Sequence, residues 1–184
     1  MQTTSLKSIF AAAMVAASLL TFSACNSGKK DEHAGHDHSS EEMSASAKPT
    51  FNDPKVESAY QHYIHVKEAL VATNAEEAKN GANALKAALT GVAGGEKAAE
   101  HAGKIAEASD VEVQRTAFFD LSSEMLTLVK NGSLASGEIY KEYCPMAFDN
   151  TGAFWLSSEK EIKNPYFGDK MLSCGEVQET ITKQ

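Results

Sequence analysis

The feature that most constrains the fold of this chain is a series of helix start and stop signals in its middle part. Asp53 followed by Pro54 places an N-cap acceptor before a proline at the first helical position, which predicts a helix over about 54–73. Asn74, with Glu77 three residues later, has the pattern of a capping box and predicts the start of a second helix. Apolar residues recur at helical spacing within both segments.

Two more helices are predicted after a glycine-rich connection that ends the second one. The alanine-rich segment 96–108 predicts a third helix with a small apolar face. Asp110 is an N-cap for a fourth, and Asn131 and Gly132 stop it. Four helices with short connections and no strand periodicity predict an all-α fold, an antiparallel up-and-down four-helix bundle.

The C-terminal quarter has a different composition, rich in aromatic and turn residues. Segments 138–148 and 153–156 flank a polar turn and predict a short β-hairpin. A final short helix is predicted over about 176–182. We expect this region to form a small irregular or β-hairpin cap that lies across the bundle, with Trp155 packed against the helices.

This quarter also holds four sulfur atoms in two short clusters. Cys144 lies near Met146, and Met171 lies near Cys174. Thiolate and thioether are soft donors, which suit monovalent copper best among biological cations, so all four residues are candidate metal ligands. A disulfide between the two cysteines is the alternative in an exported domain, and it would stabilise the fold by roughly 3–4 kcal/mol. The methionines would then be ordinary core residues.

Four short motifs of this region together resemble the sequences of one protein family. They are Tyr143-Cys144-Pro145-Met146, Gly152 to Leu156, Asn164 to Gly168, and Met171 to Gly175. Together they resemble a family of uncharacterised bacterial periplasmic lipoprotein domains, which also occur as C-terminal extensions of the membrane fusion proteins of copper and heavy-metal efflux pumps. The likeness covers about residues 53–181. It implies a role in metal handling and a metal-efflux adaptor as a partner.

The first of these motifs is also similar to the short heavy-metal-binding motif of copper-transporting systems. A histidine usually follows the methionine in that motif, whereas Ala147 follows Met146 here. The likeness therefore supports the thiol and thioether ligands and not an imidazole at this position.

Residues 1–24 have the pattern of an export signal. Its apolar run, 9–20, is too short to span a bilayer. The segment Phe22 to Cys25 is similar to a lipoprotein signal, in which cleavage leaves the cysteine as a lipid-bearing N-terminus. Cys25 is thus the predicted lipidation site, and the lipid would anchor the protein to a bacterial membrane, facing the periplasm or the cell exterior. A plain secretory signal cut near Ala24 is the alternative.

Residues 26–50 have no large apolar side chain apart from Met43, and we interpret residues 25–52 as a disordered tether before a folded domain over 53–184. The tether carries His33, His36 and His38 among acidic residues, a set that can wrap a divalent metal ion. A passive polar spacer is the alternative interpretation.

The first predicted helix carries two further candidate ligands, His62 and His65. Their spacing of three places both imidazoles on neighbouring positions of one helix surface. That arrangement can chelate a metal ion, but two ordinary polar side chains would have the same pattern.

Charge and motif content exclude other classes of function. The 17 basic residues face 25 acidic ones, for a net charge of −8, so nucleic acid is not an expected partner. The chain has no phosphate-binding glycine loop, nucleophile elbow, HExxH or CxxC, and we expect no enzyme. The sequence predicts a membrane-tethered periplasmic metal-binding lipoprotein, with copper handling or resistance through the Cys/Met site. The alternative is a metal-free, disulfide-linked helical interaction module of an efflux or envelope complex.

Overall fold

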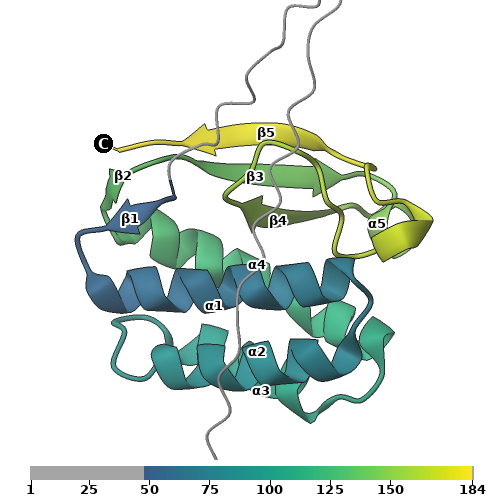
Figure 1. Ribbon diagram of the computed structural model, residues 1–184, viewed down its shortest axis with the longest axis horizontal. Coiled ribbons are helices and arrows are strands. Elements are labelled where there is room, and N and C mark those ends of the chain that lie inside the picture. Colours follow the sequence, from purple (N-terminus) through teal and green to yellow (C-terminus); the bar gives the residue numbers. More distant parts are fainter. Residues whose placement is uncertain (1–47, 184) are drawn as a thin grey trace, which may run out of the picture. The chain divides into compact units, whose positions relative to one another are not determined.

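Helices and a small antiparallel sheet make up residues 48–183, the part of the chain that the computed structural model describes (Figure 1). The long helices are α1 (Pro54–Val71), α2 (Ala75–Ala88), α3 (Glu96–Glu107) and α4 (Val111–Asn131). They lie where the capping signals predicted. The Asn74 side-chain oxygen accepts a 3.0 Å hydrogen bond from the Glu77 N–H, and the Asp110 carboxylate accepts from the Glu112 N–H at 2.8 Å.

The four helices pack in chain order, each against the next. In Figure 1, α1 and α4 lie next to the sheet, while α2 and α3 form the layer behind them. Stacked rings join the two sheet-facing helices, since the centroids of Tyr63 on α1 and Phe118 on α4 are 5.1 Å apart. Within residues 48–183, no helix is long and apolar enough to cross a membrane.

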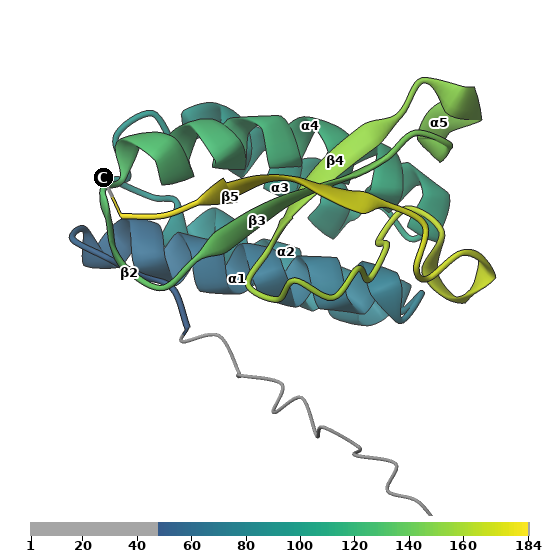
Figure 2. The same cartoon turned by 90° about the horizontal axis from the view of Figure 1, so that it is seen from above.

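Five strands complete the described part. They are β1 (Thr50–Phe51), β2 (Leu134–Ser136), β3 (Ile139–Cys144), β4 (Ala153–Ser157) and β5 (Glu176–Ile181). The first two form a small antiparallel pair, and the other three form an antiparallel sheet in the order β4-β3-β5. Short helical turns, α5 (Ala147–Asn150) and η1 (Gly168–Lys170), lie in the connections. Seen from above, the strands β3 and β5 run between α1 and α4 (Figure 2).

The predicted all-α four-helix bundle is therefore wrong, and the fold is a mixed α/β fold. The predicted hairpin is found as β3 and β4, but the segment predicted as a final helix is the strand β5. Its side chains alternate between exposed and partly buried along most of its length, and it pairs with β3 through Ile181 opposite Ile139. A partner strand far away in the chain thus overrides local helix preference.

The helices hold the sheet through its β4 edge. The Tyr63 hydroxyl, fully buried on α1, accepts a 3.0 Å hydrogen bond from the Leu156 N–H of β4. The same hydroxyl shares a 2.8 Å hydrogen bond with Ser122 of α4. One side chain therefore connects two helices to the sheet, which satisfies a backbone N–H that an edge strand would leave unpaired.

Candidate metal and thiol site

The two cysteines of the described residues meet at one end of the three-stranded sheet. Cys144 is the last residue of β3 and is fully buried, whereas Cys174 precedes β5 and is partly exposed. Both are free thiols, and their side chains lie within hydrogen-bonding distance of each other. Burial, followed by the hydrogen bond and the charge of Cys144, raises the pKa of the Cys174 thiol to about 11. We call these two residues the thiol pair.

The position of Cys174 depends on a buried asparagine. The Asn164 side chain donates a 2.8 Å hydrogen bond from Nδ2 to the carbonyl oxygen of Cys174. Its Oδ1 accepts from the backbone N–H groups of Tyr166 at 2.8 Å and Phe167 at 3.3 Å. The Asn164 N–H donates to the Leu172 carbonyl at 2.8 Å. This one residue therefore closes the segment between itself and Cys174 into a loop of defined shape.

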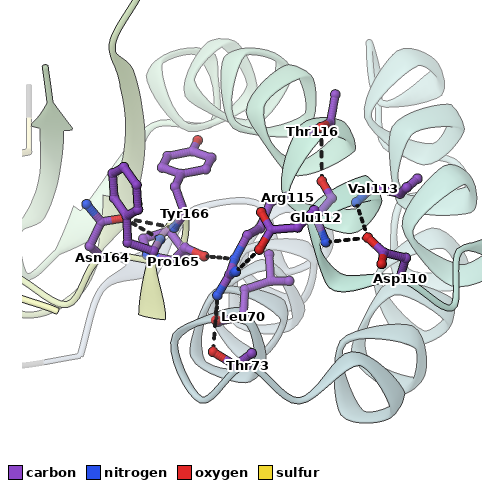
Figure 3. Close-up of polar contacts among 11 residues, drawn as sticks. Leu70, Thr73, Asp110, Glu112, Val113, Arg115, Thr116, Asn164, Pro165 and Tyr166 are labelled. Atoms are coloured by element: carbon purple, nitrogen blue, oxygen red, sulfur yellow. Dashed lines mark hydrogen bonds and ion pairs between the residues drawn. The ribbon is translucent and has the colours of Figure 1, made fainter. Parts of the chain in front are cut away.

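A buried arginine ties that loop to the helices, as Figure 3 shows. Arg115 of α4 is only 3% exposed. Its guanidinium donates to four acceptors: the carbonyl oxygens of Pro165 (2.8 Å) and Leu70 (3.2 Å), the Thr73 hydroxyl (3.1 Å) and the Glu112 carboxylate (2.7 Å). A planar guanidinium can satisfy acceptors in several directions at once, so it joins the end of α1, the start of α4 and the loop after Asn164.

The two candidate thioether ligands line the same pocket. Met146 and Met171 both line a pocket of about 590 Å³ between the start of α4 and the connections that flank β4, and neither cysteine lines it. We call it the methionine pocket. Met146 is 47% exposed, which is unusual for a core methionine, and Met171 is partly exposed. Met146 and Met171 thus share a pocket, whereas Cys144 and Cys174 contact each other.

The loop that carries Met146 has a strained backbone. Phe148, Asp149 and Asn150 adopt φ values of 50°, 55° and 65°, three consecutive non-glycine residues in the left-handed region. This conformation costs roughly 1–2 kcal/mol per residue. It persists because the Phe148 ring packs edge-on against Tyr166 and Phe119, at centroid distances of 5.4 Å each. Strain of this kind concentrates at functional sites.

A buried carboxyl group lies on the same strand as Cys144. Glu142 is fully buried and faces Trp155 across the β3–β4 pair. Burial raises its pKa to about 8, although the charge of Lys67 and the nearby Trp155 indole N–H lower it. Within residues 48–183, neither its oxygens nor the indole nitrogen reach full hydrogen-bond geometry. Glu142 is therefore protonated at neutral pH and is not a carboxylate ligand there.

The candidate imidazole ligands of α1 do not join the thiol pair. His65 Nε2 lies 2.7 Å from Glu77 Oε1, in an ion pair or hydrogen bond at the surface, and His62 is partly buried. Among the described residues, no group of three or more His, Cys, Asp or Glu side chains is placed to hold a metal ion. The predicted lipidation site Cys25 and the tether ligands His33, His36 and His38 lie outside the described residues.

Comparison with known proteins gives one match. Residues 59–137 match the profile of a family described as a protein of unknown function, DUF3347. This confirms the expected likeness to an uncharacterised domain family, while the link to efflux adaptors and lipoproteins stays a prediction. The DUF3347 match runs from within α1 to the turn after β2, so the thiol pair and the methionine pocket's sulfur atoms lie beyond it. No curated protein and no solved structure matches the chain.

Reasoning from the sequence did not identify three residues that shape the site. Arg115 is the only arginine of the chain and lies beside the predicted apolar face of its helix, which is a usable signal. Asn164 begins one of the four motifs that carry the family resemblance, but its pattern did not indicate a contact with Cys174. Glu142 has no signal, because an acidic residue in a short strand is predicted to face water.

Proposed function

We propose that this protein is a membrane-tethered, metal-binding protein of the bacterial cell envelope that handles monovalent copper through Cys144 and Cys174. The observation that carries the proposal is the meeting of these two thiols, which come from separate segments of the chain. Two thiolates form a soft two-ligand site, a donor set that favours monovalent copper over harder ions. Metal binding displaces the thiol protons, so it overcomes the raised pKa of Cys174.

The remaining parts of the proposal come from the sequence. Lipid on Cys25 would hold the protein at the membrane, and His33, His36 and His38 would collect ions near the folded domain. A copper-handling or resistance role follows from a soft site held close to an envelope membrane. A metal-efflux adaptor is the proposed acceptor, on the strength of the family resemblance.

The second candidate is an interaction module without a metal, in which the thiol pair forms a disulfide. The observation that favours this second function is the same contact between the two thiols, which a disulfide also requires. In an oxidising compartment the disulfide would stabilise the domain by roughly 3–4 kcal/mol, because it shortens the free loop of the unfolded chain.

A competition titration distinguishes the two. Reduced protein is mixed with monovalent copper and a chromophoric copper(I) chelator, while thiolate-to-copper charge transfer is followed in the ultraviolet. We expect one thiolate-bound copper per chain, and loss of the charge-transfer signal in Cys144→Ser/Cys174→Ser. Two controls, His62→Ala/His65→Ala and His33→Ala/His36→Ala/His38→Ala, should keep the copper(I) signal. Equal copper(I) affinity in the wild type and the cysteine variant would reject the proposed site.

A further inference from the structure

The methionine pocket has the properties of a second, separate ligand site. Met146 comes before β4 in the chain and Met171 comes after it, yet both line the same pocket. Met146 is 47% exposed. Met125, by comparison, is fully buried in α4 and is a core methionine. An exposed thioether gains little from hydrophobic burial, so packing alone does not account for Met146.

Both methionines are close to the thiol pair along the chain. Met146 follows Cys144 by two residues, and the Cys174 N–H donates a 3.1 Å hydrogen bond to the Met171 carbonyl within one tight turn. Each thioether is thus attached by a short, structured segment to one of the thiols. Cys144 is fully buried and Cys174 is partly exposed, so an ion from solvent would reach Cys174 before Cys144.

Thioethers are suited to a first contact with the ion for a chemical reason. A methionine sulfur carries no proton, so it can bind a soft ion without releasing one. A thiol, in contrast, binds the metal as a thiolate and so must give up its proton. Methionine side chains also have three rotatable bonds, which lets two of them close on an ion.

The surroundings of the pocket are consistent with a site for a bare or weakly hydrated ion. Aromatic rings of Phe148, Tyr166 and Phe167 line it beside the thioethers. The charged residues of the pocket balance in sign, with Glu112 and Asp149 against Arg115 and Lys170. Among residues 48–183, no histidine or cysteine lines the pocket. A soft cation would therefore find thioether sulfur as its preferred ligand there.

We propose that Met146 and Met171 form a capture site for a soft monovalent metal ion, copper(I) or its analogue silver(I), from which the ion passes to Cys144 and Cys174. The proposal rests on the function proposed above. In the transfer, two metal–thioether bonds break, two metal–thiolate bonds form, and the two thiol protons go to water. The metal stays monovalent throughout, so no oxidant or reductant takes part.

The capture site is tested directly in a protein that lacks the thiol pair. Full-length Cys144→Ser/Cys174→Ser protein is labelled with ¹³C on the methionine methyl groups and titrated with silver(I). We expect the methyl signals of Met146 and Met171 to shift together as one ion binds, while the Met125 signal stays in place. Leucine at both sites, a substitution of similar volume, should abolish the binding event. Silver(I) binding that moves neither signal, or only one, would overturn the proposal.

A rate measurement tests the transfer step in protein with both cysteines. Met146→Leu/Met171→Leu should slow formation of the thiolate–copper(I) signal by roughly tenfold or more, while the equilibrium affinity changes little. Met125→Leu is the matched control and should leave the rate unchanged. An unchanged rate in the double variant would overturn the capture step and leave copper binding by the thiol pair intact. Absence of any thiolate–copper(I) signal in the wild type would instead reject the proposed function.

Discussion

The side-chain amide of Asn164 donates a 2.8 Å hydrogen bond to the carbonyl oxygen of Cys174. Through this bond a fully buried residue controls where one of the two thiols lies. Asn164 is in turn followed by Pro165, whose carbonyl accepts from the Arg115 guanidinium at 2.8 Å. The geometry of the thiol pair therefore depends on a polar network that extends into α4, and not on the two cysteines alone.

The substitution Asn164→Asp tests the hydrogen bond to the Cys174 carbonyl separately from the other contacts of this side chain. Aspartate keeps an oxygen that can accept from the Tyr166 and Phe167 N–H groups, but it cannot donate to the Cys174 carbonyl. We expect the copper(I) affinity of reduced protein to fall by roughly tenfold, as for other residues that orient metal ligands. The competition titration measures this, well below the melting temperature of the variant.

Asn74→Asp is the control for this variant. It introduces the same change of charge at the N-cap of α2, where the side chain only accepts a hydrogen bond from the Glu77 N–H. We expect copper(I) affinity to stay at the wild-type value. Equal affinities in all three proteins would show that the Asn164 contact does not position the site.

Arg115→Ala should destabilise the whole domain. It removes donors from two buried carbonyl oxygens, those of Leu70 and Pro165, and these acceptors would stay buried without their partner. The expected loss in the free energy of unfolding is about 3 kcal/mol, measured by urea denaturation. Lysine at the same position should recover only part of it, since an ammonium lacks the planar fork. Lys104→Ala, at an exposed ion pair, should leave the urea midpoint unchanged; a similar midpoint in both alanine variants would contradict the structural role of Arg115.

The raised pKa of Cys174 predicts slow alkylation. With a pKa of about 11, only about 0.1% of this thiol is ionised at pH 8, far less than for an ordinary cysteine. We expect the rate of iodoacetamide modification at Cys174, followed by mass spectrometry, to keep rising with pH up to about 11. Cys144→Ala removes the neighbouring hydrogen bond and charge, so it should lower the pKa and speed modification at pH 8. A slower reaction in that variant would contradict the arrangement of the thiol pair.

Glu142 makes stability dependent on pH. Its pKa is raised from 4.5 to about 8, so the folded protein holds a proton that the unfolded chain loses in this interval. The stabilising contribution is therefore complete below pH 4.5, falls as the pH rises toward 8, and is absent above it. Relative to wild type, Glu142→Gln should gain on the order of 3 kcal/mol between pH 5 and pH 9.

Urea denaturation of reduced, metal-free protein at several pH values measures this difference. Glu107→Gln, at an exposed position of α3, serves as the control and should follow the wild type at every pH. A constant difference between Glu142→Gln and wild type across this range would mean that the Glu142 carboxyl titrates normally.

The helices could be predicted from the sequence because their signals are local. Asp53, Asn74 and Asp110 each cap the helix that follows them within three residues, and a capping bond needs no distant partner. The same reasoning failed for β5. Its six residues combine two glutamates and a glutamine with the β-branched Val177, Thr180 and Ile181, and the pairing with β3 decides for a strand.

The candidate site was predictable in its chemistry but not in its geometry. The composition of the C-terminal quarter pointed to Cys144 and Cys174 as partners, and the structure brings them together. It could not show that Met146 and Met171 would share a pocket, because that pocket is formed by the start of α4 and two connections that lie far apart in the sequence. The buried contacts of Asn164 and Arg115 depend on several segments at once, which a linear pattern does not contain.

The most direct test of copper binding by the thiol pair is X-ray absorption at the copper edge. Reduced full-length protein carrying His33→Ala/His36→Ala/His38→Ala is loaded with one equivalent of copper(I), so that the tether contributes no imidazole. In protein that also carries Met146→Leu/Met171→Leu, the expected result is a first coordination shell that contains only sulfur and that is lost when Cys144→Ser/Cys174→Ser is added. A shell of nitrogen or oxygen, or one that the cysteine substitutions leave unchanged, would contradict the proposed function.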